Sequence, residues 1–90
     1  MGENVPRYFF NAYDGSASID NEGTELADLK SAKVEAVLRA SNLLKNYAKS
    51  IADGEDWHLE AVNVSGLILF RIDILVTDAP VSRPDPLMKR

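Results

Sequence analysis

The sequence predicts an α+β fold in which an antiparallel sheet of three or four strands packs on one long helix, in the order β-β-α-β-β. Three observations carry this prediction. Residues 7–14 alternate in the manner of a strand, residues 29–52 repeat apolar side chains at helical spacing, and residues 57–77 alternate again around a Ser-Gly turn. We therefore expect a single domain at residues 7–78, preceded by a flexible N-terminus at residues 1–6.

The first predicted strand, residues 7–14, is rich in aromatic side chains. Alternation divides them between two faces, one with Tyr8, Phe10 and Ala12, the other with Phe9, Asn11 and Tyr13. Asp14-Gly15 then predicts a tight reversal, because glycine accepts the positive φ that such turns need. A short return strand is expected at residues 16–19, followed by a polar break at residues 20–23.

The helix predicted at residues 29–52 follows from an apolar stripe with spacings of three and four. This stripe consists of Leu29, Ala32, Ala36, Ala40, Leu43, Leu44, Tyr47 and Ile51. Asp28 stands where an N-cap residue would accept from the free amides of the first turn. Asp53-Gly54 supplies a C-terminal stop.

Residues 57–77 read as a hairpin whose turn length sets the strand register. A two-residue turn at Ser65-Gly66, which we favour, opposes Trp57 to Ile74, Leu59 to Ile72 and Ala61 to Phe70 on the core face. On the other face it opposes Glu60 to Arg71 and His58 to Asp73. A four-residue loop at residues 63–66 would shift the partners by two, and a three-residue loop would need a bulge to keep the same faces.

Composition limits the chemistry that the chain can perform. Without cysteine it can form no disulfide, thiol nucleophile or thiolate zinc site. Three of the four prolines fall in residues 79–90, so we expect a flexible tail there. The chain starts without a secretory signal and has no apolar stretch long enough to span a membrane. We therefore expect a cytoplasmic protein that does not bind membranes.

Several of these features resemble a family of short bacterial proteins classed as a domain of unknown function. They are Pro6-Arg7-Tyr8-Phe9-Phe10, Asp14-Gly15, Glu22-Gly23-Thr24-Glu25-Leu26-Ala27-Asp28-Leu29, the Ala-rich helix and the Trp-led hairpin. The resemblance covers residues 6–74 and implies no established activity. The family often carries histidine where this chain has Asn11, so no metal or proton-transfer role is carried over to that position.

No residue pattern predicts catalysis, a cofactor or a metal ion. His58 is the only histidine, and its expected place on an exposed sheet face opposite Asp73 suits a cross-strand pair better than a general base. Turns and the helix N-terminus explain the clustered carboxylates, which lack calcium-loop spacing: Asp14, Asp20, Glu22 and Glu25. The serines and glycines match no nucleophile elbow or phosphate loop. We therefore expect no catalytic, cofactor-binding or metal-binding residues and no enzymatic activity.

Two apolar regions predict an interaction surface, because one helix can cover only one face of the sheet. The uncovered sheet face carries Phe9, Tyr13, Leu67 and Leu69, and the back of the helix carries Val34 and Leu38. We expect self-association or a protein partner on the sheet face.

The alternative is a nucleic-acid-linked regulator, because the strand order is similar to that of HicB-type antitoxin domains. It would use the basic helix and the tail residues Arg83, Lys89 and Arg90. The formal net charge of -4 disfavours this second function.

Overall fold

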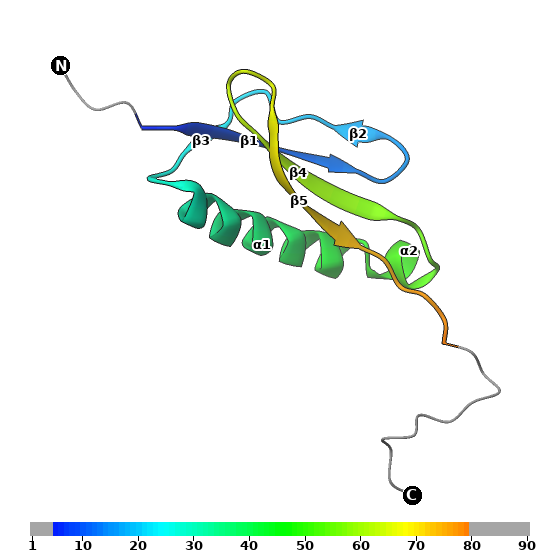
Figure 1. The fold of residues 1–90 in the computed structure, drawn as a ribbon. Helices are drawn as coiled ribbons and strands as arrows, with labels where there is room; N and C mark the ends of the chain where they lie inside the picture. The colour runs from blue at the N-terminus through cyan, green and yellow to red at the C-terminus, as the bar shows by residue number, and fades with distance from the viewer. Residues whose placement is uncertain (1–4, 80–90) are drawn as a thin grey trace, which may run out of the picture.

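A computed structural model describes residues 5–79 of the chain. In chain order the elements are β1 (Arg7–Tyr13), β2 (Ala17–Ser18), β3 (Thr24–Glu25), α1 (Leu29–Asn46), α2 (Ala48–Ala52), β4 (Trp57–Val62) and β5 (Ile68–Ile74). Figure 1 shows an antiparallel sheet with α1 along one of its faces. The α+β class and the order of the main elements are confirmed. The predicted flexible termini lie largely outside the described residues.

Within residues 5–79 the sheet has five strands, which is more than the three or four that the sequence predicts. Its order is β2-β1-β4-β5. β2 and β3 pair with the same side of β1, β3 with its first two residues and β2 with its last two. β3 was missed because two residues are too few to show alternation. Side chains hold it in place instead: Arg7 Nη2 lies 3.0 Å from Glu25 Oε2, and Arg7 Nη1 donates to the Glu22 carbonyl at 2.8 Å.

The core lies between α1 and the covered face of the sheet. On the helix it consists of three buried alanines, Ala32, Ala36 and Ala40, and the sheet contributes larger side chains, among them Tyr8, Phe10 and Leu59. Small helix residues let the backbone of α1 approach the aromatic rings closely, so the contact is narrow. The outer members of the predicted stripe therefore stay exposed: Leu29, Leu44 and Tyr47.

The predicted single helix is divided in two at Tyr47, which leaves helical geometry with φ -122° and ψ 30°. The Tyr47 ring packs against Trp57 with ring centroids 4.4 Å apart. Both predicted ends are confirmed. The Ser31 amide donates to Asp28 Oδ1 at 2.8 Å, and Gly54 follows α2 with φ +97°.

All five predicted cross-strand pairs of the hairpin are confirmed, but the two-residue turn is wrong. Val62 pairs with Ile68 while Ala61 pairs with Phe70, so Leu69 is an extra, unpaired residue in β5. The turn is a three-residue loop between Asn63 and Leu67, with the bulge that such a loop needs. Asn63 selects this loop, because its Oδ1 accepts from two loop amides at 2.9 and 3.0 Å.

Candidate functional site

The outer face of the sheet, opposite α1, carries three rows of cross-strand neighbours. The rows are Phe9–Val62–Ile68, Asn11–Glu60–Arg71 and Tyr13–His58–Asp73. Only the first row is apolar. Polar and charged side chains occupy the centre and one end of this face, among them the predicted opposed pairs Glu60–Arg71 and His58–Asp73.

The predicted outward aromatic residues are half-buried against their own chain. A Cβ placed on Gly23 would lie 2.8 Å from Phe9 Cε2, so the Phe9 ring packs directly on the Gly23 backbone. The Tyr13 ring stacks on His58 at a centroid distance of 4.8 Å. Leu67 in the loop and Leu69 at the bulge are exposed, as predicted. Ile68 of the first row is exposed as well, so the free apolar groups of this face lie at its end next to the β4–β5 loop.

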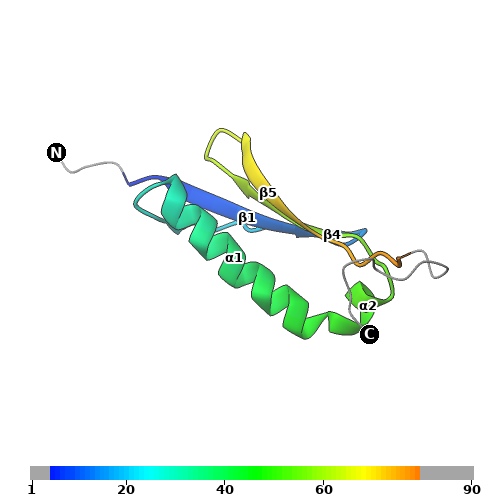
Figure 2. The same cartoon turned by 60° about the horizontal axis from the view of Figure 1, so that its bottom comes forward.

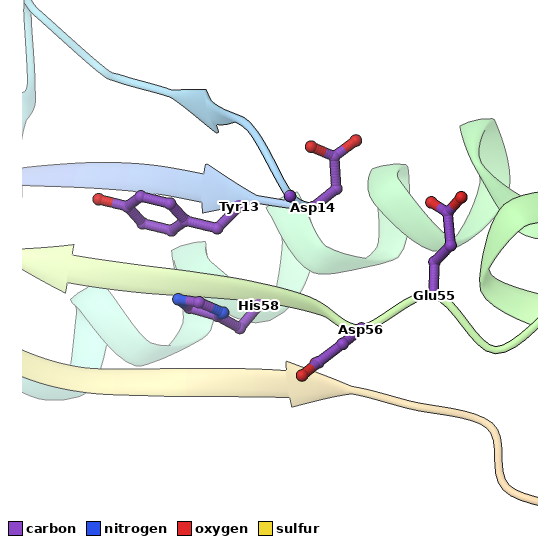
Figure 3. A pocket seen from close by; sticks show the side chains of 6 residues that line it. Tyr13, Asp14, Glu55, Asp56 and His58 are labelled. Carbon is purple, nitrogen blue, oxygen red and sulfur yellow. The ribbon is translucent and has the colours of Figure 1, made fainter.

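At the far end of the outer face, His58 lines an open pocket of about 530 Å³ together with Tyr13, Asp14, Gly15, Glu55 and Asp56. Figure 3 shows the rings of Tyr13 and His58 side by side, with the carboxylates of Asp14 and Asp56 pointing in different directions. His58 Nε2 lies 3.2 Å from Glu60 Oε2. Within residues 5–79, no three histidine or acidic side chains are grouped to hold a metal ion.

The predicted ion partner of His58 is engaged elsewhere. Asp73 lies opposite His58 in the register, but its carboxylate accepts from Arg71 Nε and Nη2 at 3.0 and 2.6 Å. The hydrogen bond from Arg71 holds the pKa of Asp73 below its ordinary value. Arg71 and Asp73 therefore form an exposed ion pair of opposite charges along the outer side of β5.

The remaining predicted acidic residues have hydrogen-bonded roles near β1. Asp20 accepts from the amides of Phe10, Glu22 and Gly23, and Asn11 Oδ1 accepts from the Asp20 amide at 2.9 Å. Arg39 of α1 lies over the Phe10 ring, 4.5 Å from its centroid, and its guanidinium is 3.8 Å from Asp20. This set of contacts fastens the loop between β2 and β3 to the helix.

A second exposed apolar surface lies on the helix side of the sheet, along α1 and the residues that follow β5. We call it the edge surface. Its residues are 47% to 59% exposed: Val34, Val37, Leu38, Leu44, Leu75 and Val76. Val37 lines both of its hollows, one of about 320 Å³ on the helix and one of about 510 Å³ between α1 and β5.

Sequence reasoning found only Val34 and Leu38 of this surface. Helical spacing places Leu44 in the predicted core stripe. It places Val37, next to the buried Ala36, neither in that stripe nor on the back of the helix. The width of the apolar sector of the helix could have indicated the whole surface. Four aliphatic residues of α1 lie outside the narrow alanine contact, and one sheet cannot bury them all: Val34, Val37, Leu38 and Leu44.

The edge surface borders an open strand. Within the described part of the chain β5 pairs only with β4, so the other side of its backbone has no strand partner. Figure 1 shows β5 in front of β4 with α1 below the sheet. Figure 2 shows the β4–β5 loop rising away from the helix, while the other end of β5 stays close to it.

A buried polar atom lies beside the core. Trp57 Nε1 has no hydrogen-bond partner among residues 5–79, and Trp57 lines a small pocket of about 210 Å³ with Tyr47 and Leu43.

None of the described helices is long and apolar enough to cross a membrane.

Comparison with known families agrees with the resemblance seen in the sequence. The family model described as Domain of unknown function (DUF6894) matches residues 7–75, which is nearly the whole described fold. Comparisons with curated proteins and with solved structures give no match.

Proposed function

We propose that this chain, which belongs to the family described as Domain of unknown function (DUF6894), is a non-enzymatic module that self-associates. The family description names no activity, so the proposal rests on the geometry of the chain itself. The surface that binds the second copy is the edge surface. One observation carries this proposal: aliphatic side chains from α1 and from the two residues that follow β5 form one continuous exposed area.

Exposed aliphatic groups favour association because their removal from water lowers the free energy. Complete burial of a Val or Leu side chain is worth about 1.5–3 kcal/mol, and each of the six residues is about half-exposed. Single exposed aliphatic residues are ordinary, but contiguous patches on small proteins mark interaction sites. The edge surface is contiguous, since Val37 joins its two hollows.

The opposite flank of α1 supports this choice by contrast. There Arg39 bonds Glu35 at 2.8 Å and Thr24 at 3.0 Å, so that flank is polar and already attached to the chain's own β3. The outer sheet face has charged residues in its central row. Lys30, Lys33 and Asp73 also line the hollows of the edge surface, but its six aliphatic side chains have no polar groups that lose hydration when a protein covers them.

A nucleic-acid partner has weaker support. The net charge is -4, and Arg39, at the middle of the basic helix, is engaged by Glu35 and lies near Asp20. The basic tail residues Arg83, Lys89 and Arg90 lie outside the described residues. The HicB-like regulator thus stays a prediction, and acidic repulsion of phosphates argues for a protein partner.

Sedimentation of two matched variants of the full chain tests the proposal. Val37→Lys places a charge in the middle of the edge surface, whereas Val64→Lys makes the same change in the β4–β5 loop, where Val64 is 74% exposed. We expect the unaltered chain and Val64→Lys to sediment as dimers at tens of micromolar, and Val37→Lys as a monomer. Equal association of the two variants would contradict this choice of surface.

A further inference from the structure

We propose that the two copies join their sheets edge to edge, with β5 antiparallel to the partner's β5 and a two-fold axis passing beside Ile72. In this register Arg71 of each chain lies opposite the partner's Asp73. The inference rests on the proposed function and adds to it the geometry of the partner. It follows from three features of β5: its open backbone, its charge pattern and the helix beside it.

The first feature is the open backbone. Natural sheets protect exposed edges with charged side chains, above all lysine, and with proline, bulges or very short strands. β5 has its bulge at Leu69, near its start, and residues 70–76 contain neither lysine nor proline. Its two charged residues, Arg71 and Asp73, have opposite signs, so they repel an added strand only in some registers. The regular stretch Phe70 to Ile74 therefore offers free amides and carbonyls on the side away from β4, as a template for a further strand.

The second feature is the charge pattern, which selects one register. Opposed residues of an antiparallel pair lie on the same face, so a two-fold register of β5 must centre on one residue. Centring on Arg71 would oppose two arginines, and centring on Asp73 would oppose two aspartates. Centring on Ile72 opposes arginine to aspartate twice and also places Phe70 opposite the partner's Ile74, which suits both faces.

In the single chain, Arg71 and Asp73 bond each other across one intervening residue, with side chains 48% and 58% exposed. Neither side chain is fixed in the core, so both are free to turn toward the partner. Exposed ion pairs of this kind contribute little to affinity and more to the choice of register. The affinity then comes from the backbone bonds and from the helices.

The third feature is the position of α1, which packs over β1, β4 and β5. A two-fold axis perpendicular to the sheet keeps both helices on the same face. With strands about 4.8 Å apart, two helices that are each centred over their own β4 would lie about 14 Å apart. This is wider than the ~8–10 Å spacing of packed helices, so the aliphatic side chains of the two edge surfaces would line the space between them.

Charge exchange between chains tests the register. In Arg71→Asp, both charged positions of β5 are acidic, and in Asp73→Arg both are basic. In the proposed register each variant alone opposes like charges twice, and a mixture opposes unlike charges twice. We expect each variant to associate about tenfold or more weakly than the unaltered chain, and an equimolar mixture to regain the dimer.

Rescue by mixing cannot come from contacts within one chain, because neither chain changes on mixing. Circular dichroism confirms that each variant is folded, and Arg71→Glu with Asp73→Lys serves as a second pair if one variant unfolds. Failure of the mixture to regain the dimer would overturn the register. If the unaltered chain dimerises and Val37→Lys prevents it, that failure leaves the proposed function standing, whereas a monomeric unaltered chain overturns both.

Discussion

The two edges of the sheet differ in how they meet solvent. On one side, β2 and β3 have two residues each and are separated by the loop that Asp20 holds. On the other side, β5 is seven residues long and ends in aliphatic side chains beside an aliphatic helix flank. Short, interrupted strands prevent a further strand from pairing, whereas a long regular strand permits it. The chain therefore blocks one edge and leaves the other available.

Asp20 is the residue on which the closed edge depends. It accepts three backbone amides, including that of Phe10 in the gap between the β2 and β3 pairings. Burial raises its pKa, but the amides of Gly23, Phe10 and Glu22, together with Arg39, outweigh burial and leave the pKa below its ordinary value. The ionised carboxylate is thus part of the native structure.

The largest effect is expected from Asp20→Ala, which opens the closed edge. Loss of the carboxylate leaves three amides without this acceptor, two of them partly buried, and we expect a loss of about 2–4 kcal/mol in the free energy of unfolding. Thermal unfolding would show a fall of roughly 8–30 °C in the midpoint. Glu22→Ala, a neighbouring change of the same charge, is the control and should stay close to the unaltered chain. A similar stability for both variants would show that Asp20 does not hold this edge.

Acid should weaken the closed edge of the sheet. Because the pKa of Asp20 is lower in the folded chain than its ordinary value of 3.8, its stabilising contribution is complete above that pH and is lost as the pH falls further. The lowered pKa values of Asp28 and Asp73 act in the same direction. Chemical denaturation between about pH 5 and pH 2 should therefore show a steeper loss for the unaltered chain than for Asp20→Ala. If the stabilities of the two chains fall in parallel with pH, the ionised carboxylate of Asp20 does not stabilise the closed edge.

The smallest effect concerns the open edge in the unaltered chain. Raising the protein concentration should slow amide hydrogen exchange at the outward amides of β5, because dimerisation gives them acceptors. Amides of β2 and β3 should exchange at an unchanged rate, since that edge remains outside the contact. Equal slowing of exchange at both edges, or no slowing at β5, would contradict the claim that the second copy pairs with the β5 edge alone.

Much of the fold follows from the sequence because it depends on local periodicity. The alternation of β1 and the pairing of Leu59 with Ile72 were predictable, since a strand with one buried face has little freedom of register. β3 and the hairpin loop were not predictable in this way. They depend on single side-chain bonds, from Arg7 to Glu25 and from Asn63 to its loop amides, which leave no periodic trace.

The surface was less predictable than the fold. Val34 and Leu38 were found because they oppose the helix stripe, but the aromatic residues of the outer face were expected to be free and are half-buried. Whether an exposed aliphatic residue joins a larger patch depends on which flank of α1 meets the open strand. That relation is tertiary, so helical periodicity alone could not show that Val37 and Val76 line one hollow.

Sedimentation equilibrium of the unaltered chain of 90 residues tests most directly whether the edge surface binds a second copy. The single chain has a mass of 9.9 kDa. We expect the weight-average mass to rise toward twice that value as the concentration passes through the micromolar range. A mass that stays at that of one chain up to the highest soluble concentration would contradict the account.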